Sequence, residues 1–308
     1  MLFVNKLQLG KSELEVSDIA LGCMRMKDLT KENAAAVIEN AREEGIDFFD
    51  HADIYGGGDS EELFAKALKL TSVSRQNLIL QTKCGIRPGF FDFSKEHIIA
   101  SVEGSLRRLN TDYIDILLLH RPDALVEPEE VAEAFTELET SGKVRHFGVS
   151  NHNPMQVELL KKHVQQELIV NQMQLSLMHT PMIDAGLNVN MHNDPAVVRD
   201  SSTLDYSRLH DMTIQAWSPF QYGMIKGVFV GNDNFPEVNT KLQEIAEKKG
   251  VSDSAAAVAW ILRHPARIQT IVGTMNTERL SSIAKASGVQ LTKEEWYELY
   301  RAAGNELP

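Results

Sequence analysis

The sequence has little cysteine, no long apolar stretch and no recognisable export signal. Only two cysteines, Cys23 and Cys84, occur among its 308 residues. Two isolated cysteines exclude a disulfide framework or a cysteine-rich metal site, and we expect buried free thiols in a reducing compartment. No apolar run approaches the roughly 18 residues that span a bilayer, and the start, MLFVNKLQLG, lacks a secretory signal pattern. We therefore expect a soluble, cytoplasmic protein.

Positive charge is also scarce. The chain has 31 Lys and Arg residues against 43 Asp and Glu residues, a formal net charge of -12 at pH 7. Proteins that bind duplex nucleic acid need concentrated Lys and Arg to displace counterions. The charge balance therefore argues against a nucleic-acid partner, and equally against binding to an acidic membrane surface.

Two common nucleotide-binding motifs are missing. No Gly-x-Gly-x-x-Gly follows the first expected strand, which counts against a Rossmann domain. Gly56–Ser60 (GGGDS) enters a helix but lacks the Lys and Ser/Thr that end a phosphate-binding P-loop. This glycine-rich segment is therefore interpreted as a turn.

What the sequence does contain is a regular alternation of strand-like and helix-like segments. The strand-like segments are short and rich in Ile, Leu, Val or Phe, as expected for strands buried on both faces. They are Ile19–Gly22, Phe48–Asp50, Leu78–Thr82, Ile114–Leu119, His146–Val149, Ile169–Met173, Ile214–Trp217 and Ile268–Val272. Helical spacing of apolar residues predicts Thr30–Glu44, Asp59–Leu70, Ser94–Leu109, Pro128–Ser141, Pro154–His163, Thr203–Asp211, Asn239–Lys249, Asp253–Arg263 and Thr277–Ala286.

Eight strands, each followed by a helix, predict an α/β fold, a single (β/α)₈ TIM barrel over residues 1–308. Phe3–Val16 is predicted to form an N-terminal hairpin that turns at Gly10 and Lys11, and Lys293–Ala303 a C-terminal helix. The segment Met178–Ser202 is polar and Asn-rich, and we predict an irregular, functional or mobile loop there.

Four polar residues lie at or just after the ends of three expected strands. They are Asp50, Tyr55 five residues later, Lys83 and His120. Barrels of this kind carry their chemistry at the C-terminal ends of strands. A Tyr hydroxyl can protonate a carbonyl oxygen, and a neighbouring ammonium would lower its pKa from about 10. Asp50 would then hold Lys83 charged, and His120 would orient the carbonyl oxygen.

Each of these residues alone has an ordinary structural interpretation. The Asp could cap a helix, the Lys could sit in a structural ion pair, and the Tyr and His could simply pack. It is the joint pattern, in this order and at these strand ends, that indicates a proton-transfer site.

That pattern resembles the aldo-keto reductase family over nearly the whole chain. The family carries an Asp, Tyr, Lys and His tetrad in this order, which matches Asp50, Tyr55, Lys83 and His120. Gly148–Asn151 (GVSN) and Trp217–Phe220 (WSPF) also fit its pattern. The resemblance implies an NAD(P)H-dependent oxidoreductase that reduces an aldehyde or ketone, with Tyr55 as proton donor.

The resemblance also implies which residues bind the cofactor. Ser150, Asn151 and Gln172 would hold the nicotinamide carboxamide, and Trp217 would stack on the ring. The following run, Ser218, Pro219 and Phe220, would line the pyrophosphate path.

The adenosine-phosphate segment of the family matches IVGTMNTERL. Thr274 and Arg279 take the positions that usually contact the 2′-phosphate, and an Arg can clamp a phosphate. We therefore expect NADP(H) to be preferred over NAD(H). Gly273 is also among the implied cofactor contacts, although it stands where some members carry a phosphate-binding Lys. Ile283 stands where many carry an Asn for the adenine, so both positions depart from the pattern.

Two other functions stay open at this stage. Some relatives of the family are non-catalytic, NADPH-binding subunits of potassium channels and retain the tetrad. A metal-dependent hydrolase on the same barrel could use His51, Asp53, His120 and Asp123 as ligands, but the first strand lacks the His-x-His typical of zinc hydrolases. We expect no bound metal.

The substrate pocket should be built by loops over the barrel mouth. Candidates are Met24–Met26, Arg87–Phe93, Arg121–Leu125, Met178–Ser202 and the C-terminal tail. The phenylalanines of the second range and the methionines of the first suggest an adaptable apolar pocket. Arg121 is interpreted either as a site for an anionic substrate or as half of an ion pair with Asp123. The sequence does not identify the carbonyl substrate or the oligomeric state.

Overall fold

The barrel is closed and all eight of its strands run parallel. A computed structural model describes residues 4–307, so Phe3 and Pro308 lie outside the described residues. Each strand pairs with two neighbours, and the ring order is β10-β11-β14-β3-β4-β5-β8-β9. The strands are β3 (Ile19–Gly22), β4 (Phe48–Asp50), β5 (Ile79–Cys84), β8 (Ile114–Leu119), β9 (Val144–Ser150), β10 (Leu168–Gln174), β11 (Thr213–Trp217) and β14 (Gln269–Val272). The predicted fold class is confirmed.

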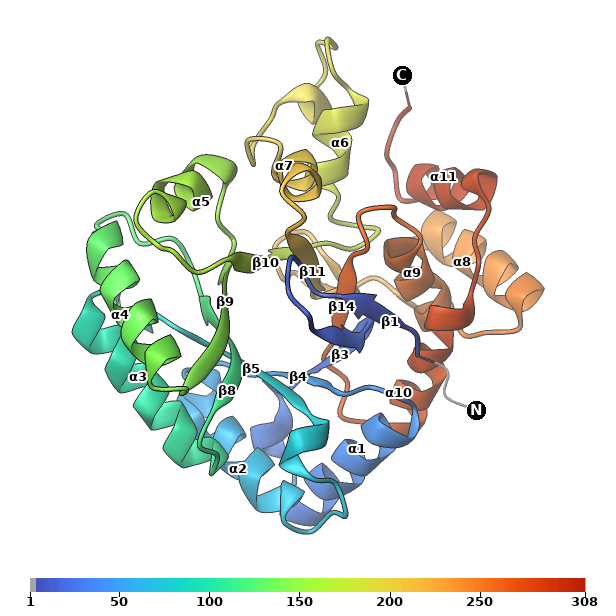
Figure 1. The fold of residues 1–308 in the computed structure, drawn as a ribbon. Coiled ribbons are helices and arrows are strands. Elements are labelled where there is room, and N and C mark those ends of the chain that lie inside the picture. Colours follow the sequence, from blue (N-terminus) through green and yellow to red (C-terminus); the bar gives the residue numbers. More distant parts are fainter. Residues whose placement is uncertain (1–3, 308) are drawn as a thin grey trace.

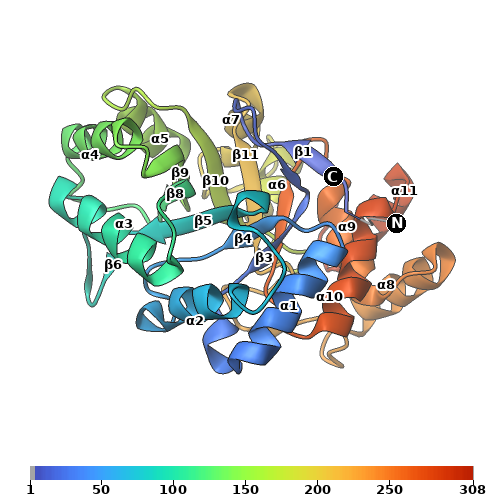
Figure 2. The same cartoon turned by 60° about the horizontal axis from the view of Figure 1, so that its bottom comes forward.

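Helices form the outer layer, as Figures 1 and 2 show. They are α1 (Lys31–Glu43), α2 (Asp59–Leu68), α3 (Lys95–Leu109), α4 (Pro128–Thr140), α5 (Pro154–Lys161), α6 (Pro181–Leu187), α7 (Thr203–Leu209), α8 (Pro236–Lys249), α9 (Asp253–Leu262), α10 (Thr277–Ala284) and α11 (Lys293–Ala302). Thr30 caps α1 and Ser94 caps α3, each by accepting a hydrogen bond from the backbone N–H three residues on. No helix among residues 4–307 is long and apolar enough to cross a membrane.

The N-terminal hairpin covers the end of the barrel where the strands begin. It consists of β1 (Lys6–Gln8) and β2 (Glu15–Ser17), and Figure 1 shows it lying across the ring of strands. Leu9 and Val16 are fully buried against barrel residues that include Phe48 and Ile169. Gly10 has a φ of 55°, and a Cβ there would meet the backbone oxygen of Ile169 at 2.4 Å. The turn therefore needs glycine to approach the barrel so closely.

The segment that we expected to be an irregular loop is partly helical. Within Met178–Ser202, α6 begins at Pro181, and a short 3₁₀ turn covers Asp194–Ala196. Met182 and Ile183 are buried, and Asp184 accepts a hydrogen bond from the Tyr300 hydroxyl of α11 at 2.6 Å. The prediction was wrong here because the apolar residues are too few for a clear helical period, and the helix is stabilised by its tertiary contacts.

Two short hairpins follow strands of the barrel. One pairs β6 (Ile86–Arg87) with β7 (Phe90–Phe91), and the other pairs β12 (Gln221–Tyr222) with β13 (Gly227–Val228). The second lies directly after β11 and therefore at the C-terminal end of the barrel strands.

Candidate active site

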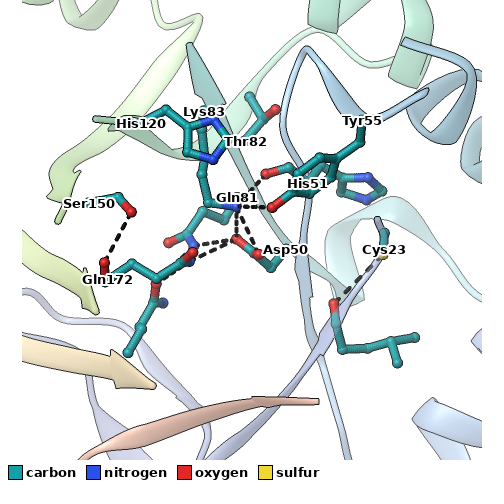
Figure 3. Close-up of polar contacts among 12 residues, drawn as sticks. Cys23, Asp50, His51, Tyr55, Gln81, Thr82, Lys83, His120, Ser150 and Gln172 are labelled. Atoms are coloured by element: carbon teal, nitrogen blue, oxygen red, sulfur yellow. Dashed lines mark hydrogen bonds and ion pairs between the residues drawn. The ribbon is translucent and has the colours of Figure 1, made fainter. Parts of the chain in front are cut away.

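The four candidate catalytic residues come together at the C-terminal end of the barrel. Asp50 is the last residue of β4, and His120 directly follows β8. Tyr55 begins a 3₁₀ turn, Tyr55–Gly58, that leads into α2. Lys83 lies inside β5, one residue before its end, because that strand extends two residues further than its sequence pattern indicates. Figure 3 shows the four side chains gathered around the ammonium of Lys83.

Lys83 and Asp50 form a fully buried ion pair. Lys83 Nζ lies 2.7 and 2.8 Å from the two carboxylate oxygens of Asp50, and 2.7 Å from the backbone oxygen of His51. The Lys83 side chain has no exposed surface. Burial alone would lower the pKa of Lys83, but the Coulombic attraction of Asp50 and Tyr55 and the hydrogen bonds raise it above its usual value. Lys83 therefore stays charged despite its burial.

Tyr55 contacts Lys83 on the side that faces the cavity. Lys83 Nζ lies 3.3 Å from the Tyr55 hydroxyl, and Tyr55 lines a cavity at this end of the barrel. Burial raises the pKa of Tyr55 above its usual value, and the attraction of Lys83 only partly offsets that effect. The expected net lowering of the Tyr55 pKa is therefore wrong for the protein without ligand. Tyr55 rests as the protonated phenol, which is the form a proton donor needs.

His120 faces Tyr55 across the cavity. The two rings are 6.0 Å apart in an edge-on arrangement. Burial, together with the nearby charges of Lys83 and Arg121, holds the pKa of His120 well below its usual value. The imidazole is therefore neutral near pH 7 and can donate one hydrogen bond to an oxygen in the cavity.

A cavity of about 280 Å³ opens over these residues. Its wall includes eight residues that the sequence assigned to the cofactor: Ser150, Asn151, Gln172, Trp217, Ser218, Pro219, Phe220 and Gly273. Asp50, Tyr55 and His120 belong to the same wall, whereas Lys83 lies behind it. The structure therefore brings most of the predicted site together, although it does not test the roles of these residues.

The donors and rings in this wall suit a nicotinamide. Asn151 Nδ2 donates to Ser150 Oγ at 2.8 Å, and Trp217 Nε1 donates to Asn151 Oδ1 at 3.2 Å. These bonds fix the Trp217 ring beside two groups that can bind an amide. Asn151 and Ser218 adopt left-handed φ angles of 61° and 53°. Such conformations are uncommon in non-glycine residues and cluster at ligand sites.

The predicted phosphate contacts are less closely grouped. Gly273 lines the cavity, but Thr274 and Arg279 are not part of its wall. Arg279 is exposed at the start of α10. Arg25 was missed by sequence reasoning: it lines the cavity, and its Nη1 donates to the Gly273 backbone oxygen at 3.2 Å. The sequence offered one signal: a basic residue shortly after the first strand, in a chain with glycine at position 273, where some family members carry Lys.

The loops around the cavity differ from those expected. Met24 and Arg121 line it, but Met26 is fully buried in the core. None of the cavity wall comes from Arg87–Phe93, from Met178–Ser202 or from the described part of the C-terminal tail, which ends at Leu307. Phe90 and Phe91 are exposed, and Phe93 packs under Gly85. The β12–β13 hairpin takes their place, through Gln221, Ile225 and Val228.

The structure also shows the surroundings of Arg121, of the two cysteines and of the candidate metal ligands. Arg121 lies over the Trp217 ring at 5.7 Å and forms no ion pair with Asp123, which accepts backbone N–H groups instead. Cys23 and Cys84 are buried free thiols, as expected. Among residues 4–307, no group of three or more His, Cys, Asp or Glu side chains is placed to hold a metal ion.

Comparison with known proteins gives consistent matches over almost the whole chain. The Aldo/keto reductase family model matches residues 18–303. An uncharacterized oxidoreductase, YcsN, of Bacillus subtilis is 37% identical, covering 99% of this chain and 100% of its own. A 6-dehydroglucose reductase of Agrobacterium fabrum is 36% identical, covering 96% and 97%. A crystal structure of the thermostable aldo-keto reductase Tm1743 matches with a TM-score of 0.77 and 24% identity, covering 96% and 99%.

The matched region contains every strand of the barrel and all four residues of the tetrad. The fold and the sequence matches therefore agree: this chain belongs to the aldo/keto reductase family of oxidoreductases.

Proposed function

We propose that this protein reduces an aldehyde or ketone to an alcohol with NADPH, and that Tyr55 donates the proton. The observation that carries the proposal is the buried contact series from Asp50 through Lys83 to Tyr55, which ends at the cavity. NADPH, when bound, supplies the hydride. The remaining task is to deliver a proton to the carbonyl oxygen, and that task falls to side chains of the chain itself.

Each residue of the tetrad has a role that its surroundings support. Neutral His120 donates a hydrogen bond that orients the carbonyl oxygen towards Tyr55. Tyr55 transfers its proton to that oxygen, and the ammonium of Lys83 stabilises the phenolate that remains. Asp50 keeps Lys83 charged and fixed in direction. Tyr55 is therefore protonated before the reaction, and the ammonium of Lys83 balances the negative charge that its oxygen carries afterwards.

The cofactor preference rests on basic residues near the predicted phosphate position. We propose that Arg25 supplies the positive charge that Gly273 lacks, and that Arg279 adds to it at the start of α10. NADPH should bind more tightly than NADH. Replacing either arginine, as Arg25→Gln or Arg279→Ala, should reduce the difference between the affinities for NADPH and NADH.

Quenching of the protein's tryptophan fluorescence, to which Trp217 contributes, measures the affinity for each cofactor. Arg301→Ala, which changes an exposed arginine on α11, serves as the control and should leave both affinities unchanged. Equal affinities of the wild-type protein for NADPH and NADH would contradict the proposed preference.

Two observations support a proposal for the substrate class: the activity named for a relative and the polar side chains in the cavity wall. The Agrobacterium relative is a 6-dehydroglucose reductase. Arg25, Arg121 and Gln221 give the cavity polar groups that can bind hydroxyls. We propose a sugar-derived aldehyde as the substrate. NADPH oxidation with a panel of such aldehydes and simple apolar ones tests this, and faster turnover of the apolar aldehydes would contradict it.

A further inference from the structure

A layer of buried glutamines crosses the barrel beneath the catalytic residues. Interiors of such barrels are usually filled by branched apolar side chains. Here Gln81 of β5, Gln215 of β11 and Gln269 of β14 are fully buried, and Gln172 of β10 is 3% exposed. Burying an amide is unfavourable unless its polar atoms find partners. Four amides at one level of the barrel therefore need an explanation.

The closed ring of strands brings these side chains together. Gln172 is the direct neighbour of Gln215 across β10 and β11, and Gln215 is the direct neighbour of Gln269 across β11 and β14. Asp50 and Gln81 are neighbours in the same way across β4 and β5. In the ring, β4 and β5 lie opposite β10 and β11. The two sets therefore meet across the interior of the barrel.

Hydrogen bonds connect the set from one side to the other. Asp50 Oδ1 accepts from Gln81 Nε2 at 2.6 Å and from Gln172 Nε2 at 3.1 Å, as Figure 3 shows. The same two nitrogens also donate to Gln215 Oε1, at 2.8 and 3.1 Å. Gln215 Nε2 then donates to Gln269 Oε1 at 2.7 Å, and Gln269 Nε2 to the backbone oxygen of Ser17 at 2.7 Å.

Both ends of this series can only accept hydrogen bonds, so they determine the direction of every amide. The Ser17 carbonyl requires Gln269 to present its nitrogen, which turns the Gln269 oxygen towards Gln215. Gln215 must then present its own oxygen to Gln81 and Gln172. Gln81 Nε2 donates to both Asp50 Oδ1 and Gln215 Oε1, and Gln81 Oε1 has no hydrogen-bond partner. Rotating the Gln81 amide would bring its single oxygen against two other acceptors, Oδ1 of Asp50 and Oε1 of Gln215.

We infer that this glutamine relay, Gln81, Gln172, Gln215 and Gln269, holds the Asp50 side chain in position against Lys83, so that Lys83 stays charged beside Tyr55. Asp50 Oδ1 accepts hydrogen bonds from two glutamines and from Lys83, so the glutamines determine the direction in which the carboxyl group faces Lys83. The side-chain hydrogen bonds of Gln215 go to Gln81, Gln172 and Gln269 and not to Lys83 or Tyr55, and Gln215 lies outside the cavity wall. It is therefore a positioning residue, and its kinetic effect rests on the proposed reductase function.

The direct test replaces Gln215 by Leu and follows the charge of Lys83 in the ligand-free protein. Lysine labelled with ¹³C at Cε reports the titration by NMR, and Lys83→Met assigns the signal. Without the relay, Asp50 is held less firmly beside Lys83. Its attraction then offsets less of the lowering of the Lys83 pKa that burial causes. The Lys83 titration should therefore move to lower pH by about one unit or more. In the reductase assay, the alkaline limb of the kcat profile should move in the same direction.

Two further variants separate positioning from folding. Ile169→Val removes one methylene group from the barrel interior at the hairpin end, where Ile169 lies against Gly10. It should lower the melting temperature and leave the Lys83 titration unchanged. The triple variant Gln81→Leu, Gln215→Leu and Gln269→Leu removes three of the four amides together. It should be more stable than Gln215→Leu alone, because fewer buried polar groups lack partners. Its Lys83 titration should stay displaced.

An unchanged Lys83 titration in Gln215→Leu, or a normal one in the stable triple variant, would overturn the relay. If Gln215→Leu does not fold, Gln269→Leu breaks the relay at the Ser17 end and should displace the titration in the same direction. Failure of the wild-type protein to reduce any carbonyl would contradict the proposed function instead. The NMR titration uses no cofactor or substrate, so the two failures are distinguishable.

Discussion

At the scale of single residues, burial and the neighbouring charges together determine the protonation states around the active site. Lys83 and His51 are both fully buried, but only Lys83 has an opposite charge beside it. Lys83 is therefore charged. Burial lowers the pKa of His51 to about 3, with smaller contributions from the charges of Lys83 and Arg75, so the imidazole is neutral. Neither of its ring nitrogens has a hydrogen-bond partner. The ring packs edge-on against the Phe64 ring, with 4.7 Å between the two ring centres.

This environment predicts a pH-dependent effect of His51→Leu. Above pH 6.5, His51 is neutral both folded and unfolded, and the variant should be about as stable as wild type or more stable, because it buries no unpaired nitrogens. As the pH falls below 6.5, the unfolded histidine takes up a proton that the folded one, with a pKa of about 3, does not. The wild type should therefore lose up to about 1.4 kcal/mol per pH unit relative to the variant.

Urea unfolding of both proteins between pH 7.5 and 4.5 measures this difference. Other titrating groups, among them Asp18 and Asp53 with pKa values raised to about 6 by burial, are present in both proteins and cancel. A stability difference that stays constant over this pH range would show that His51 is not buried in its neutral form.

At the scale of elements, the turn after β4 determines where Tyr55 stands. Three successive glycines, Gly56, Gly57 and Gly58, have positive φ angles of 63°, 69° and 105°. They reverse the chain between Tyr55 and the start of α2. A Cβ on Gly58 would meet Arg108 Cδ at 2.6 Å, and Arg108 Nε donates to the buried carboxylate of Glu61 at 2.7 Å. The turn is therefore tied to the packing of α2 and α3.

Gly58→Ala should destabilise the protein by about 1–3 kcal/mol, because it combines an unfavourable φ with displacement of Arg108. It should also lower turnover, since Tyr55 starts the same turn. Gly57→Ala is the matched control: its φ is also positive, but nothing lies within 4 Å of its added Cβ. Chemical denaturation compares the two variants, and equal losses of stability would rule out the contact with Arg108 as the cause.

At the scale of the whole molecule, the sequence predicts what depends on local pattern and order. All eight barrel strands were predicted, with ends within two residues of those observed, because each is a short buried apolar run. The tetrad was identified by residue type, order and position at strand ends. The structure brings Asp50, Tyr55 and His120 into one cavity wall, with Lys83 behind it.

Other features depend on contacts between distant segments, so sequence reasoning did not find them. The glutamine relay exists because closure places β5 opposite β11, and each glutamine alone is only a polar residue within a strand. Arg25 depends on its approach to Gly273, more than two hundred residues away in the chain. The direction of the Tyr55 pKa shift depends on depth of burial, which residue order does not give.

The most direct test of the proposed mechanism is single-turnover NADPH oxidation with an aldehyde substrate, comparing wild type with Tyr55→Phe. Tyr113→Phe is the control, because its ring lies between Arg75 and Arg145 at 4.1 and 3.6 Å, outside the cavity wall. We predict that Tyr55→Phe binds NADPH normally but reacts about 10²–10⁴-fold more slowly, while the control matches wild type. A Tyr55→Phe rate close to that of wild type would contradict Tyr55 as the proton donor.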